Sequence, residues 1–103
     1  MFVKIYEYHI EENKEEYFLE IQEKAVRIYR KYLNCDVMYL KSIEHETMWL
    51  EISRYNSEGE YLKEIQKVNK EPALKELYEQ FESCLVPDKH SIRERNFIMK
   101  LSM

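Results

Sequence analysis

The chain has 103 residues, of which 45% are hydrophobic and 35% are charged. This balance is typical of a folded protein and excludes a disordered chain, which has too little apolar surface to form a core. The net charge of -4, with lysines and arginines interleaved among glutamates, argues against nucleic acid as a partner. We therefore expect one domain, residues 1–103, with a modest core.

The N-terminal segment does not resemble a signal peptide, because Lys4, Glu7 and His9 interrupt its apolar residues. No apolar stretch reaches the roughly 20 residues that span a bilayer. Cys35 and Cys84 show neither the spacing of a redox or zinc motif nor the density of a disulfide framework. These patterns predict a cytoplasmic protein with reduced thiols and no membrane contact.

The first half of the chain predicts a strand, a helix and a hairpin. Residues 2–10 are apolar on both phases of the alternation, which is typical of a strand covered on both faces. Asn13 and Glu16 have the spacing of a capping pair, and an apolar stripe of period three to four follows as far as residues 33–34. Residues 37–43 and 47–55 are rich in β-branched and aromatic residues and predict the hairpin.

The second half predicts an interrupted helix and a last strand. Ser57 and Glu60 form a second capping box that opens the helix. Pro72 interrupts it and suits the first turn of a new helix, because proline has no backbone N–H. Residues 91–101 alternate again and predict the strand that completes the sheet.

This order of elements predicts an α+β fold of the ferredoxin-like β-α-β-β-α-β type, with an antiparallel sheet and both helical regions on one face. The alternation places Trp49, Tyr55, Phe97 and Met99 on the other face of the sheet. So much apolar area is unusual on a monomer, and a second copy of the chain is the commonest partner. We therefore expect a homodimer.

The hairpin at 37–55, the run from Tyr55 to Leu62 and the second helical region interrupted by Pro72 resemble the dimeric α/β-barrel superfamily. That superfamily includes the antibiotic-biosynthesis monooxygenases. The resemblance implies that two subunits pack sheet to sheet as a dimeric α/β barrel, and that a small-molecule cavity lies between each sheet and its own helices. Members of the superfamily include cofactor-independent oxygenases of aromatic substrates, so the resemblance implies an activity of this kind.

Heme-degrading members of the superfamily resemble one another in an Asn on the first strand, a Trp in the sheet region and a His on the second helical region. This chain offers Trp49 but has neither the Asn on its first strand nor a His between Ser57 and Val86. Heme degradation by that set of residues is therefore not expected.

Three residues are candidates for catalysis. Tyr6 is a strand tyrosine whose phenol can act as an acid or base when its pKa is shifted. His9 ends the first strand, and histidine is the usual first candidate for acid–base chemistry. Trp49 is the sheet tryptophan of the resemblance. Packing in the core or an interface is the alternative for the two aromatic residues, and no partner group for His9 is fixed by the sequence.

No metal motif, glycine-rich phosphate loop or nucleophile elbow is present, so we expect neither a metal nor a cofactor. Arg93 and Arg95 share a sheet face and either attract a small anion or pair with glutamates. Two functions remain open. One is a cofactor-independent monooxygenase-like protein that acts on or binds a small aromatic or quinone-type molecule. The other is a non-catalytic dimeric module for small-ligand binding or stress response.

Overall fold

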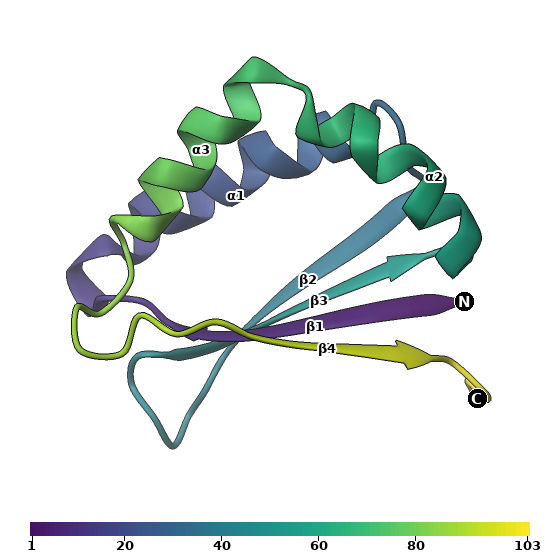
Figure 1. Cartoon of the computed structure of the whole chain (residues 1–103). Coiled ribbons are helices and arrows are strands. Elements are labelled where there is room, and N and C mark those ends of the chain that lie inside the picture. The colour runs from purple at the N-terminus through teal and green to yellow at the C-terminus, as the bar shows by residue number, and fades with distance from the viewer.

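The computed structural model describes all 103 residues and has one four-stranded antiparallel sheet with its helices on one face (Figure 1). The strands follow the order β2-β3-β1-β4 across the sheet. The elements are β1 (Phe2–His9), α1 (Glu15–Tyr29), β2 (Cys35–Lys41), β3 (Met48–Tyr55), α2 (Glu58–Asn69), α3 (Pro72–Glu82) and β4 (Arg93–Ile98). The predicted α+β, ferredoxin-like fold is confirmed.

Local sequence signals explain how the second helical region is divided. The Ser57 hydroxyl accepts a hydrogen bond from the Glu60 backbone N–H at 3.1 Å, so the predicted cap of α2 is confirmed. Pro72 occupies the first turn of α3, where its missing N–H costs no helical hydrogen bond. The predicted cap at Asn13 is wrong: a short 3-10 turn, Glu12–Lys14, takes up this residue, and α1 begins at Glu15 without a side-chain cap.

The two faces of β3 are the reverse of those that the alternation suggested. Tyr8 pairs with Trp49 and Phe2 pairs with Tyr55 across the β1–β3 ladder, and all four side chains are buried. The expectation that Trp49 and Tyr55 lie on the open face is therefore wrong. The reason is that α1 and α3 bury the largest rings of the strand, because these rings remove the most apolar area from water.

The core is centred on Phe18 of α1, whose side chain is fully buried. Its ring lies 5.1 Å from that of Trp49, 5.7 Å from that of Tyr8 and 6.1 Å from that of Phe81, measured between centroids. These contacts join α1, α3 and the two central strands. The cluster fixes the helices above the sheet and defines the wall of the space beside it.

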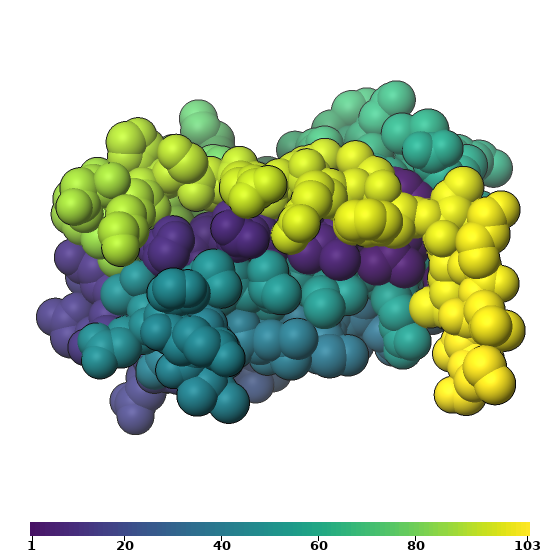
Figure 2. All heavy atoms as spheres, turned by 90° about the horizontal axis from the view of Figure 1, so that it is seen from below, coloured from purple at the N-terminus to yellow at the C-terminus, as the bar shows by residue number.

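The face of the sheet away from the helices is largely uncovered, and Figure 2 shows the molecule from that side. The strand pairing places a set of apolar side chains on it: Val3, Ile5, Met38, Leu40, Leu50, Ile52 and Phe97. Phe97 is 47% exposed, as the alternation predicted for this residue. We call these seven residues the open-face patch.

Arg93 and Arg95 lie on the same open face. Their guanidinium groups are 3.7 and 3.6 Å from the carboxylate of Glu7. Of the two alternatives for these arginines, pairing with a glutamate is the one observed. No helix is both long enough and apolar enough to cross a bilayer.

Candidate functional site

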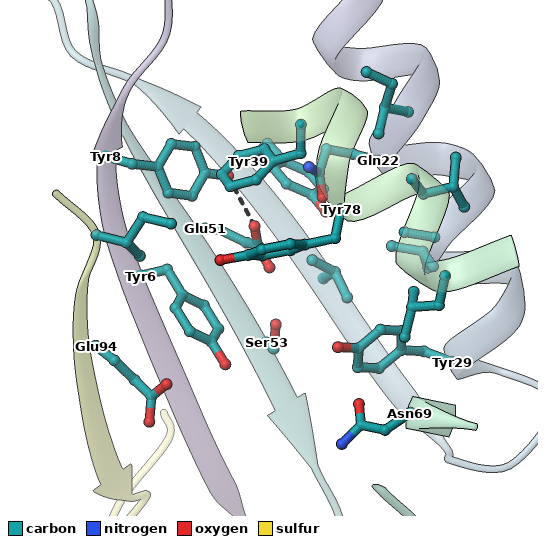
Figure 3. Close-up of a pocket in the computed structure, with 18 of the residues that line it drawn as sticks. Tyr6, Tyr8, Gln22, Tyr29, Tyr39, Glu51, Ser53, Asn69, Tyr78 and Glu94 are labelled. Carbon is teal, nitrogen blue, oxygen red and sulfur yellow. Dashed lines mark hydrogen bonds between the residues drawn. The ribbon is translucent and has the colours of Figure 1, made fainter. Parts of the chain in front are cut away.

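A cavity of about 590 Å³ lies between the helix-facing side of the sheet and helices α1 and α3 (Figure 3). Most of its lining is apolar or aromatic, and a few polar groups project into it. The polar and aromatic lining residues are Tyr6, Tyr8, Gln22, Tyr29, Tyr39, Glu51, Ser53, Tyr55, Asn69, Lys75, Tyr78, Phe81 and Glu94. This size and composition are typical of small-molecule sites.

Glu51 is the acidic group on the floor of this cavity. It lies in the middle of β3, on the side that faces the helices, and the Tyr8 hydroxyl donates a hydrogen bond to its Oε1 at 2.8 Å (Figure 3). Burial raises the pKa of the Glu51 carboxyl to about 7, although the hydrogen bond from Tyr8 opposes the shift. Glu51 therefore exchanges its proton near neutral pH, as a general base requires.

The second carboxyl oxygen of Glu51 is open to the cavity. The hydrogen bond from Tyr8 goes to Oε1, and Oε2 has no such partner in the protein. Every fully buried side-chain oxygen or nitrogen in the chain has a hydrogen-bond partner, so Oε2 is not fully buried. Since Glu51 lines the cavity, Oε2 remains accessible from it. A bound molecule can donate a hydrogen bond or a proton to this oxygen.

The phenols around Glu51 act as neutral hydrogen-bonding groups. Burial raises the pKa of Tyr6, Tyr8, Tyr29 and Tyr39, with smaller contributions from neighbouring acidic groups. Tyr39 donates to Oε1 of Gln22 at 2.7 Å, which holds both side chains against the cavity wall. The Tyr6 ring projects toward the same space from β1 (Figure 3).

A second carboxylate, that of Glu94, lies at the edge of the cavity but is already paired. Lys4, whose side chain is only 7% exposed, places its Nζ 3.1 Å from Glu94 and 2.7 Å from Oδ1 of Asn96. The same ammonium lies 5.1 Å from the ring centroid of Tyr61. Glu51 is thus the carboxyl of the cavity that has no cationic partner.

The structure places the three predicted catalytic residues in different surroundings. Tyr6 lines the cavity. Trp49 packs against Phe18 in the core and does not line the cavity. His9 is on the opposite face from Tyr8 along β1, and its Nδ1 forms a hydrogen bond with Oγ1 of Thr47 at 2.9 Å. Only Tyr6 is brought to the cavity.

Glu51 was missed by the sequence reasoning, although a signal was present. It lies between Trp49 and Ser53, both buried, on one phase of β3. An acidic residue on the buried phase of a central strand must be paired or have an altered pKa, because burial of a lone charge is costly. Because the alternation suggested that this phase of β3 lies on the open face, Glu51 was not considered as a site residue.

The remaining chemistry-bearing residues do not form a second centre. No group of three or more His, Cys, Asp or Glu side chains is placed to hold a metal ion. Cys35 and Cys84 are free and buried, and burial raises the pKa of both thiols. Both thiols are therefore held in their neutral form.

The sequence matches no protein-family model and no curated protein. Solved structures match the fold over nearly the whole chain. The cofactor-independent oxygenase SnoaB from Streptomyces nogalater is similar with a TM-score of 0.72 and 5% identity, covering 99% of this chain and 95% of its own. An uncharacterized NIPSNAP domain protein from Burkholderia xenovorans gives a TM-score of 0.72 and 15% identity, covering 96% and 94%.

An antibiotic biosynthesis monooxygenase is also similar, with a TM-score of 0.69 and 9% identity, covering 96% of this chain and 98% of its own. At these identities the likeness concerns the fold. The element order, the strand order and these neighbours agree, and the chain shares the ferredoxin-like α+β fold of these solved structures.

Proposed function

We propose that this chain is a cofactor-independent monooxygenase-like protein that acts on a small aromatic molecule, with Glu51 as its base. The observation that carries the proposal is the Glu51 carboxyl, which opens into an aromatic cavity of about 590 Å³ and has a pKa raised to about 7. The similarity to SnoaB, described as a cofactor-independent oxygenase, supports the same reading.

A phenol with a free ring carbon opposite its hydroxyl is the substrate that fits this chemistry. Oε2 of Glu51 accepts the phenol proton, and the electron-rich phenolate then donates electrons to O₂. One oxygen atom forms a bond to the ring carbon and becomes the second quinone oxygen, while the other leaves as water. Phenol and O₂ give quinone and water, and the four electrons that reduce O₂ all come from the substrate.

Tyr6 is the other cavity residue with a role in this proposal. Its hydroxyl stays protonated because burial raises its pKa, so it donates a hydrogen bond to a substrate oxygen as negative charge develops there. Trp49 and His9, proposed from the sequence as catalytic, lie outside the cavity. In our proposal Trp49 supports the wall through Phe18, and His9 holds the end of β1 through Thr47.

Oxygen uptake with a panel of phenols and naphthols tests the proposal. We expect uptake and quinone formation with the wild-type chain, and a loss of about 100-fold or more in the Glu51→Gln variant, as is common when a general base is removed. Glu76→Gln makes the same chemical change on the exposed side of α3 and should keep the activity. Binding of the phenols without oxygen uptake would instead favour the non-catalytic ligand-binding module, and absence of binding would refute both.

We also propose that two copies of the chain associate through the open-face patch. The patch consists of seven apolar side chains in one continuous sheet face, and such a surface is usually covered in soluble proteins. A two-fold pair of sheets buries the patch of each copy against the other.

Analytical ultracentrifugation tests this association. Phe97→Asp should give a monomer, because it places a charge in the patch. Leu62→Asp is the matched control, since Leu62 is 57% exposed on α2, away from the sheet face. A stable dimer of a folded Phe97→Asp variant would show that the interface lies elsewhere.

A further inference from the structure

The cavity is mostly apolar, but its lining favours positive charge over negative charge. Six tyrosines and Phe81 line it, and the faces of aromatic rings carry partial negative charge. The Glu51 carboxyl stands among these rings on the floor. The ionised Glu51 carboxylate attracts positive charge and hydrogen-bond donors and repels anions, and any ring that borders the cavity with its face acts in the same direction.

The charged groups at the edge of the cavity do not reverse this character. The Glu94 carboxylate is 3.1 Å from the Lys4 ammonium, so these two charges offset one another. Lys75 is the cation that lines the cavity, and it is an exposed residue of α3. Exposed lysines keep their ammonium group in water, where its charge is screened. Charge recognition in the interior therefore rests on Glu51.

We infer that the cavity selects neutral or cationic aromatic molecules that present an O–H or N–H donor to Oε2 of Glu51, and that it rejects aromatic carboxylates. The inference rests on the same cavity as the proposed function and adds the class of substrate that it accepts. Glu51 is the residue that sets this selectivity, through direct contact with the bound group. An aromatic acid would bring a second carboxylate into a site with no free interior cation.

Selectivity of this origin depends on pH through Glu51. The titratable groups that line the same cavity are Tyr6 and Tyr8 on β1, Tyr39 on β2, Tyr55 on β3, Tyr29 on α1, Lys75 and Tyr78 on α3, and Glu94 on β4. Burial raises the pKa of the first five of these phenols, so they remain neutral across the range in which Glu51 ionises. Preference for cations should thus grow as pH rises through about 7.

Three probes of one ring system test the inference: naphthol, naphthylmethylamine and naphthoate, substituted at the same position and titrated by calorimetry. At about pH 8 we expect the ammonium to bind at least about tenfold more tightly than the carboxylate, a ratio that corresponds to a modest screened charge pair. Naphthol should fall between them. At about pH 5.5, where Glu51 is protonated, the ratio should shrink toward one.

Two variants identify the residue responsible. Glu51→Gln keeps the shape of the side chain and an acceptor for Tyr8. At about pH 8 it should remove most of the difference in affinity between the ammonium and the carboxylate probe. Glu76→Gln makes the same chemical change on the exposed side of α3, outside the cavity, and it should keep the ratio.

The outcomes separate the inference from the proposed function. If all three probes bind with equal affinity, or if Glu51→Gln retains the full ratio, the inference is overturned while the cavity remains a ligand site. If no probe binds to the wild-type chain, both are overturned.

Discussion

Replacement of Glu51 by Gln should stabilise the protein above neutral pH. In the folded chain, burial raises the Glu51 pKa from its ordinary value of 4.5 to about 7. The folded state therefore binds the proton more tightly than the unfolded state does. The contribution of the protonated Glu51 to the free energy of unfolding is therefore fully present below about pH 4.5 and is lost as the pH rises to about 7. Above that pH the effect of Glu51 is constant.

The size of the effect follows from the two pKa values. Since each tenfold change in a protonation equilibrium corresponds to about 1.4 kcal/mol, ionising Glu51 in the folded state costs up to about 3 kcal/mol. Glutamine cannot ionise and retains an acceptor for the Tyr8 hydroxyl. The variant should therefore gain about 2–3 kcal/mol over the wild type between pH 5 and pH 8.

Urea unfolding followed by far-UV circular dichroism at pH 5, 6, 7 and 8 measures this difference. Wild type and variant are compared at one protein concentration, because association would add to the apparent stability. Glu76→Gln serves as the control on the exposed side of α3 and should follow the wild type at every pH. The reasoning would be refuted if Glu51→Gln were less stable than the wild type at pH 8, or if the two unfolding free energies changed in parallel.

Three further substitutions test other parts of the structure. Phe18→Ala should destabilise the chain by about 3–5 kcal/mol, because Phe18 is fully buried at the centre of the ring cluster; a loss below about 1 kcal/mol by urea unfolding would contradict this account of the core. Ser57→Ala should cost about 1 kcal/mol, as the Glu60 backbone N–H loses its acceptor, whereas Ser57→Asp should retain the stability; equal melting temperatures of the wild type and the Ala variant would contradict the cap. Trp49→Phe should reduce stability but leave the affinity for naphthol unchanged, since Trp49 does not line the cavity; a large loss of affinity with little loss of stability would restore Trp49 to the site.

The elements of this fold could be predicted because their signals are local. Ser57 and Glu60 mark the start of α2 through a hydrogen bond between neighbouring turns, and Pro72 marks the start of α3 through its missing N–H. Asn13 has the same local signal but lies in a 3-10 turn, so the spacing of a capping pair did not suffice there.

The candidate site could be predicted only in part. Tyr6 was named from its strand position and does line the cavity, but Glu51 was not named. Whether a residue of β3 faces the helices depends on its register with β1, and that register places Tyr8 opposite Trp49 and next to Glu51 across the ladder. A strand with apolar residues on both phases does not reveal which phase is the core.

The sequence by itself therefore determined the order of the elements, the class of the fold and the exposure of Phe97 on the face away from the helices. The tertiary structure alone decided which face of β3 is buried, and with it the placement of the Glu51 carboxyl beside the Tyr8 hydroxyl at 2.8 Å. The physical reason is that caps and periodicities are set by residues a few positions apart. The pKa of a buried carboxyl is set instead by the solvent it loses to α1, α3 and the neighbouring strands.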